Sequence, residues 1–254
     1  MSKTELGKFY PIYEDLGVKV PTFIQGAHAQ AFEPEFEKAR KDNPYFAFKG
    51  IDNSGVLKGS NVFSNGLANK LVSPNFRIIT PTDNIYQAIF PMIENNFYTD
   101  LNALDVWDEK PSYEKNTKIW QQIIKLAEKH LDRDVKFPFR IQGFYCIPNK
   151  RKAGDYQARI EPAPNFRIIE DDKLNLPTGT KFNELDEKGM VKPFDNGRFT
   201  KYTLKNGLSR VYLDSIGGLG SSDCILDGTN GSGRVVVVSA EGVAQKLNSN
   251  NLKK

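Results

Sequence analysis

The fold of this chain is decided by residues 113–148, YEKNTKIWQQIIKLAEKHLDRDVKFPFRIQGFYCIP, where the spacing of the apolar residues changes. From Tyr113 to Leu131 they recur every three or four positions, which is typical of an amphipathic helix packed on a core. From Phe137 to Pro148 aromatic and β-branched residues are frequent, which indicates a strand. A helix followed by a strand-rich region predicts an α+β fold.

The predicted helix has a start signal and two distinct faces. Ser112, which follows Pro111, is in position to cap its N-terminus. The apolar stripe is opposed by a charged and polar face, as on a helix that covers a core. This second face carries Lys115, Lys118, Gln122, Lys125 and Lys129.

Further strands are predicted after the first one, and residues 149–154 form a basic loop that joins the first strand to the second. Asn206-Gly207 lies between two predicted strands, and this pair favours a β-hairpin because both residues tolerate positive φ. A late valine run is apolar throughout, which predicts burial on both faces. The predicted strands are Phe137–Pro148, Tyr156–Ile160, Phe166–Ile169, Phe199–Leu204, Leu208–Leu213 and Arg234–Ala240.

The N-terminal half combines helices with turn-rich segments. Glu33–Lys41 is predicted to be a short helix with Pro34 in its first turn. Glycine, asparagine and serine recur through Gly50–Gly66, which indicates turns between short strands or an irregular surface loop. Another helix is predicted over Ile85–Leu101, and Pro91 should kink it or divide it in two.

These elements predict an α+β fold in which central amphipathic helices pack on a mainly antiparallel, β-rich C-terminal region. We expect that region to be a sandwich or a partly open barrel. Residues 1–134 form the predicted loop-rich N-terminal and helical region, and residues 135–254 form the β-rich region. Both can belong to one compact domain, because 254 residues fit one large domain or two small ones.

Charge is unevenly distributed along the chain, whose net charge is +4. Residues 1–110 hold 11 Lys and Arg against 14 Asp and Glu, a balance of −3, whereas residues 111–254 hold 24 against 17, a balance of +7. The basic part is compatible with an acidic partner.

No apolar run approaches the roughly 20 residues of a membrane span, and the first residues lack the hydrophobic stretch of a signal peptide. We therefore expect a cytoplasmic protein or a component of an assembled particle.

One hexapeptide, PNFRII, occurs twice, at Pro74–Ile79 and at Pro164–Ile169. A duplicated unit would present Arg77 and Arg167 in equivalent positions. The sequences on either side of the two copies do not align, which favours a strand start that occurs twice by chance.

The residue types that usually carry catalysis are sparse. His28 lies among small residues, and His130 is near the end of the predicted helix, where its charge would suit the helix dipole. No zinc-binding spacing, phosphate loop or nucleophile elbow is present. The backbone amides of Gly217–Asp223 could bind an anion, although a flexible link between strands explains that segment better.

Acidic residues near the predicted strands suggest a weaker hypothesis, a Mg²⁺ site of the kind that nucleases use. Asp155 precedes one strand, and Asp171–Lys173 follows another with an Asp-x-Lys spacing. Asp186–Lys188 has the same loose pattern, so solvent-exposed turns explain these residues better. We predict no metal and no cofactor.

Positive and aromatic residues come together around the basic loop. Cations that neutralise phosphates and aromatic rings that stack on bases are the usual means of binding single-stranded nucleic acid. An ordinary charged hairpin tip is the other explanation. The candidate nucleic-acid-binding residues are Arg140, Tyr145, Lys150, Arg151, Lys152, Tyr156 and Arg159.

The sequence therefore favours a non-catalytic binding or assembly protein, such as a structural component of a phage or viral particle. Its expected partners are other protein subunits or copies of itself. The stretches Gly50–Asn69 and Ser215–Gly233, rich in glycine, asparagine and serine, would then become ordered against neighbouring chains. Nucleic-acid binding is the alternative, and a metal-dependent nuclease is a third hypothesis. No residue is predicted to be catalytic.

Overall fold

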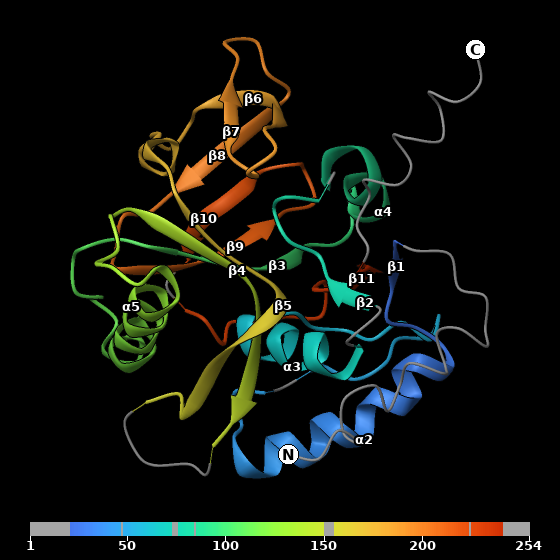
Figure 1. Cartoon of the computed structure of the whole chain (residues 1–254). Helices are drawn as coiled ribbons and strands as arrows, with labels where there is room; N and C mark the ends of the chain where they lie inside the picture. The colour runs from blue at the N-terminus through green and yellow to red at the C-terminus, as the bar shows by residue number, and fades with distance from the viewer. Residues whose placement is uncertain are drawn as a thin grey trace, which may run out of the picture.

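The computed structural model describes residues 21–46, 48–72, 76–83, 85–149, 155–223 and 225–240. Helices and strands form the predicted α+β fold, with a β-rich C-terminal region (Figure 1). In these ranges no helix has both the length and the apolar character needed to cross a bilayer. The helices are α2 (Ala27–Asp42), α3 (Val62–Val72), the π-helical turn η1 (Ile85–Ile89), α4 (Phe90–Ile93), the 3₁₀ turn η2 (Glu114–Asn116), α5 (Thr117–Leu131) and the 3₁₀ turn η3 (Asp172–Asn175).

A large sheet of eight strands has the order β5-β4-β3-β9-β10-β8-β6-β7, and a small sheet has the order β1-β11-β2. Neighbouring strands are antiparallel except for β8 and β10, which are parallel. The strands are β1 (Thr22–Phe23), β2 (Phe76–Ile78), β3 (Thr99–Val106), β4 (Phe139–Pro148), β5 (Ala158–Glu170), β6 (Lys181–Leu185), β7 (Val191–Pro193), β8 (Phe199–Thr203), β9 (Leu208–Leu213), β10 (Leu219–Asp223) and β11 (Val236–Ser239).

The large sheet curls, so the turn between β6 and β7 reaches the end of β5 at the other edge. Arg140 on β4 donates from Nη1 to the carbonyl oxygen of Gly189 in that turn, at 3.0 Å. Lys188 Nζ lies 3.6 Å from a carboxylate oxygen of Asp171, which directly follows β5. The same contact contains a small apolar cluster formed by Ile169, Leu174 and Met190.

Strand β3 lies inside the large sheet, between β4 and β9. It belongs to the predicted N-terminal region, residues 1–134, whereas both of its neighbours belong to residues 135–254. A boundary at residue 134 would therefore divide one continuous sheet.

The predicted helix over Ile85–Leu101 is confirmed only as far as Ile93. It consists of η1 followed by α4, and Pro91 lies in the first turn of α4, where no N–H donor is needed. The chain then turns, with Asn95 at a φ of 68°, and continues into β3. All eight residues of β3 are buried, so this strand has no alternation of exposed polar and buried apolar residues by which it could be predicted.

The segment Gly50–Gly66, which was predicted to form turns between short strands or an irregular surface loop, leads into the buried helix α3, which begins at Val62. Ten of its eleven residues are buried, so it has no amphipathic period. Asn61 caps α3, because its Oδ1 accepts the N–H of Ser64 at 2.8 Å. At Gly66 a Cβ would lie 2.5 Å from Sγ of Cys146 on β4, so glycine permits this close approach. The helix is thus ordered by its own chain.

The predicted long helix is confirmed as α5, and its apolar residues Ile119, Ile123 and Ala127 are buried. Ser112 does not cap α5, because Ser112 Oγ accepts an N–H of Asn206 at 2.6 Å and η2 leads into the helix. Helix α5 packs against β5 (Figure 1).

The strands predicted on either side of Asn206-Gly207 are confirmed as β8 and β9, but the prediction that they form a hairpin is wrong. Gly207 has the expected positive φ of 63°. The two strands do not pair, because β10 lies between them. Strand β10 begins at Leu219, inside the segment that was predicted to be a flexible link. The valine run is buried as predicted and forms β11, the middle strand of the small sheet.

Two elements are longer than predicted. Helix α2 begins at Ala27, so Pro34 lies in its interior rather than in its first turn. Strand β5 joins two predicted strands into one, although it contains Pro162 and Pro164. Proline is tolerated there because β5 is an edge strand, where a missing N–H donor breaks no bond to a neighbour.

Candidate functional site

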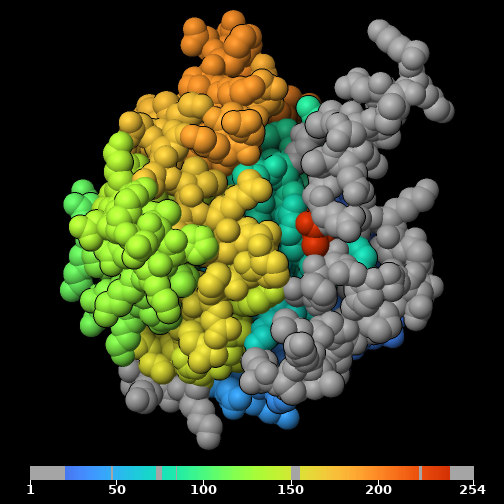
Figure 2. All heavy atoms as spheres, viewed as in Figure 1, coloured from blue at the N-terminus to red at the C-terminus, as the bar shows by residue number. Residues whose placement is uncertain are grey.

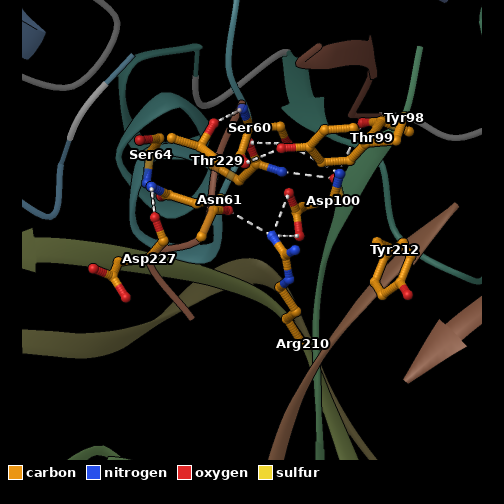
Figure 3. Close-up of polar contacts among 12 residues, drawn as sticks. Ser60, Asn61, Ser64, Tyr98, Thr99, Asp100, Arg210, Tyr212, Asp227 and Thr229 are labelled. Carbon is orange, nitrogen blue, oxygen red and sulfur yellow. Dashed lines mark hydrogen bonds and ion pairs between the residues drawn. The ribbon is translucent and has the colours of Figure 1, made fainter. Parts of the chain in front are cut away.

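A polar network lies beside the central strand β3 (Figure 3). Asp100 on β3 is fully buried, and Nη1 of Arg210 on β9 lies 3.2 Å from its Oδ1. The backbone N–H of Asp100 donates to Ser60 Oγ at 3.0 Å, and Asn65 donates to the carbonyl oxygen of Asp100 at 2.6 Å. The network therefore ties the start of α3 to the large sheet.

The segment that follows β10 completes this network (Figure 3). Arg210 donates to the carbonyl oxygen of Gly228 at 2.6 Å, and the N–H of Ser60 donates to Thr229 Oγ1 at 2.8 Å. Tyr98 donates its hydroxyl to the carbonyl oxygen of Ser60 at 3.1 Å, and burial raises the pKa of Tyr98. The residue types resemble those of an acid–base site, but these groups bind one another. We assign this network a structural role.

A second charged cluster lies farther along β3. Arg140 on β4 is 2% exposed, and its Nε donates to Asp105 Oδ1 at 2.6 Å. Ser221 on β10 donates its hydroxyl to Asp105 Oδ2, also at 2.6 Å. Arg140, a predicted nucleic-acid-binding residue, is therefore bound to Asp105 in the interior and lies away from the surface.

Lys201 on β8 is buried near this cluster. Its Nζ donates to the carbonyl oxygens of Leu174 at 2.8 Å and of Lys173 at 3.1 Å. Burial lowers the pKa of Lys201 to about 8 from its ordinary value of 10.5. The folded chain therefore releases this proton at a lower pH than the unfolded chain does.

Because of Lys201, we expect the free energy of unfolding to increase by about 2 kcal/mol when the pH is raised from about 7.5 to about 9.5. Below about pH 8 the folded chain carries a desolvated charge, which costs stability. Above that pH the folded chain is neutral at this site while the unfolded chain still binds the proton, so stability rises until about pH 10.5. Urea unfolding at a series of pH values measures this rise. The variant Lys201→Met should lack it, and an equal rise in both proteins would contradict the assignment.

The other described candidates for nucleic-acid binding, Tyr145, Tyr156 and Arg159, do not form one surface. Residues 150–152 lie outside the described part of the chain. Tyr145 and Tyr156 are buried, so neither ring is exposed for stacking on a base. Arg159 is exposed on β5 and forms an ion pair with Glu161 at 2.6 Å. Of the described candidates, Arg159 alone lies on the surface.

The acidic residues of the hypothetical metal site have other partners. Asp171 caps η3 by accepting the N–H of Lys173 at 3.0 Å, and Asp186 pairs with Lys173 Nζ at 2.6 Å. Asp155 forms an ion pair with Lys118 on α5. Within the residues that the structure describes, no three His, Cys, Asp or Glu side chains are grouped so that they could hold a metal ion.

In the glycine turn that was considered as an anion site, backbone N–H groups donate to a carboxylate of the same chain. Asp214 Oδ1 accepts the N–H of Gly218 at 2.6 Å and the N–H of Ile216 at 3.0 Å. These two amides are therefore not directed at an external anion.

The two PNFRII copies lie in different sheets as far as the structure describes them: Phe76–Ile78 of the first form β2, and the second lies in β5. Arg77 forms two hydrogen bonds of 2.6 Å with the carboxylate of Asp83, whereas Arg167 is exposed. The two arginines are thus not in equivalent positions, contrary to the hypothesis of a duplicated unit.

An open groove of about 670 Å³ lies beside the edge strand β5. The C-terminal end of α5 and the turn between β6 and β7 also line it. Figure 2 shows this face, with α5 in green, β5 in yellow and the β6–β7 region in orange. The lining residues are Phe166–Glu170 of β5, His130, Leu131 and Arg133 at the end of α5, and Glu187 and Lys188 of the turn.

The groove has more positive than negative side chains. Arg133 binds Glu170 through two hydrogen bonds of 2.9 and 2.7 Å, and this pairing holds the pKa of Glu170 below its ordinary value. Lys188 and Glu187 are both exposed. Arg167 is exposed, and no ion pair joins it to a described residue. Arg167 is therefore the groove cation most open to a ligand.

The groove residues were not predicted as a binding site. Arg167 was singled out only as part of the repeat, and His130 only as the end of a helix. The prolines at Pro162 and Pro164 were a usable signal, because two prolines within a strand indicate a sheet edge. Comparison with models of known protein families, with curated proteins and with solved structures finds no match for this chain, so the geometry of the groove alone supports a functional assignment.

Proposed function

We propose that this protein is a non-catalytic binding protein that holds a segment of another protein chain in the groove beside β5, as a subunit of a larger assembly. The observation that carries the proposal is an open groove of about 670 Å³ on the edge of a sheet. Ligand pockets commonly have volumes of about 300–1,000 Å³. A sheet edge also offers backbone N–H and C=O groups to a second chain.

Two features support binding over catalysis. In the networks around Asp100 and Asp105, the charged side chains form ion pairs with other groups of the same chain. In the groove, the ring of His130 packs edge-on against Phe166 with 5.1 Å between ring centroids. No serine, threonine or cysteine is among the described residues that line the groove, so none of these residues gives His130 a hydroxyl or thiol to activate.

We expect random-peptide display against the whole chain to select peptides that bind in the groove. Chemical-shift changes in NMR spectra should then concentrate on Phe166–Glu170. Arg167→Glu should weaken binding at least about tenfold, because it reverses the charge of an exposed cation in the groove. Lys125→Glu makes the same change of charge on the exposed face of α5 and should bind like the unaltered protein.

Failure to select peptides, or chemical-shift changes that map elsewhere, would contradict this proposal.

The nucleic-acid alternative is supported by exposed Arg159 and by the positive balance after residue 110. Labelled DNA and RNA, single- and double-stranded, should be titrated across a salt series. Salt-sensitive binding that is lost when Lys150, Arg151 and Lys152 are all changed to Ala would favour the alternative.

A further inference from the structure

At the N-terminal end of β5, a side chain of α5 binds backbone groups on the outer edge of the strand. Gln122 donates from Nε2 to the carbonyl oxygen of Ala158 at 3.1 Å and accepts the N–H of Ile160 at Oε1 at 3.4 Å. Its amide thus binds the strand as the backbone of a neighbouring strand would. Two residues later Pro162 has no N–H to offer, and the register of the ladder with β4 shifts between Pro162 and Arg167.

The other end of β5 is also closed. Glu170 binds Arg133 and accepts the backbone N–H of Lys136 at 2.7 Å, so the chain that follows α5 crosses the end of the strand. Between these two closures lies Phe166–Ile169, the part of β5 that lines the groove. Among the described residues, Arg167–Ile169 pair with β4 on one side only, and Phe166 lies where the register of this ladder shifts.

The length of the open stretch limits what can pair with it. Four strand residues span roughly 10–13 Å at about 3.3 Å per residue. A partner segment of about four to six residues in an extended conformation matches this length. Longer pairing would meet the register shift and the prolines Pro162 and Pro164 at one end, or would have to displace the pair formed by Arg133 and Glu170 at the other.

Charge decides which extended segment fits. Arg167 is exposed at the middle of the open stretch, and the exposed ammonium of Lys188 lines the same groove. An acidic side chain on the incoming strand would complement them. A symmetric pairing of two copies of this chain centred on Arg167 would instead place two arginines opposite each other, which is unfavourable.

We propose that Phe166–Ile169 takes up an extended acidic segment of a partner protein as an additional strand of the large sheet. This inference rests on the proposed function, because it specifies how the same groove holds its protein partner. The backbone of β5 supplies affinity that does not depend on sequence, and Arg167 selects an acidic residue.

Short labelled peptides test the inference on the whole chain. The peptide TVEVTV should bind at least about tenfold more tightly than TVKVTV, and Arg167→Glu should reverse this order. N-methylation at alternate residues, in the two complementary patterns, should abolish binding in one pattern, because it removes the N–H donors from one edge of the peptide. Hydrogen exchange should slow at Phe166–Ile169 when TVEVTV is bound. Circular dichroism of Arg167→Glu checks that this variant is folded, and Lys125→Glu is again the matched control.

The outcomes separate the two proposals. If selected peptides bind in the groove without preferring acidic residues, or if neither N-methylation pattern affects binding, the added strand is wrong and the proposed function stands. If neither the selected peptides nor TVEVTV bind, both are wrong. A dimer in light scattering that dissociates on adding TVEVTV would identify a second copy as the occupant and overturn the inference.

Discussion

Replacing Asp105 with alanine is expected to lower the free energy of unfolding by about 3–5 kcal/mol. Arg140 would remain buried, at 2% exposed, without the carboxylate that now lies 2.6 Å from its Nε. Ser221 would lose the acceptor of its hydroxyl at the same time. Urea unfolding at neutral pH, followed by circular dichroism, measures the loss.

Two further variants show whether the loss comes from the uncompensated charge. Glu184→Ala removes an ion pair with Lys192 in which both side chains are at least half exposed, so stability should hardly change. Combining Asp105→Leu with Arg140→Met removes both buried charges, and this should restore much of the stability that Asp105→Ala loses. If Asp105→Ala is no more harmful than Glu184→Ala, the buried pair does not hold the sheet.

Phe63→Ala is expected to cost about 3–5 kcal/mol, because it leaves a cavity beneath α3. Phe63 is fully buried, and its ring centroid lies 4.7 Å from that of Tyr156 and 5.6 Å from that of Phe46. The same unfolding measurement applies. Phe194→Ala is the matched control, since Phe194 is 55% exposed and should contribute little. Equal losses in the two variants would mean that α3 is not part of the core.

Local periodicity accounts for the elements that were predicted correctly. Helix α5 has one buried stripe and one charged face, and β8 and β9 are short strands on either side of a turn. Two elements that are buried on all sides were missed, because polar residues interrupt their apolar residues and no alternation between core and solvent is present. Helix α3 and strand β3 are both of this kind. A cap at Asn61 was the one local signal for α3.

The candidate site was less predictable than the fold. Its residues come from three segments, 130–133, 166–170 and 187–188, which the curl of the large sheet brings together. Arg140 illustrates the same difficulty. It was predicted to be a surface cation, and only the position of Asp105 on the neighbouring strand explains its burial.

The sequence by itself therefore determined the α+β class, the long amphipathic helix, most of the later strands and the burial of the valine run. These features depend on periods of two or 3.6 residues or on a continuous apolar run, which are local properties of the chain. Only the tertiary structure decided that β10 separates β8 from β9, that two charged networks are internal, and that an open groove lies along β5. Strand order, the pairing of buried charges and the shape of a groove depend on residues far apart in the chain, and no local pattern records them.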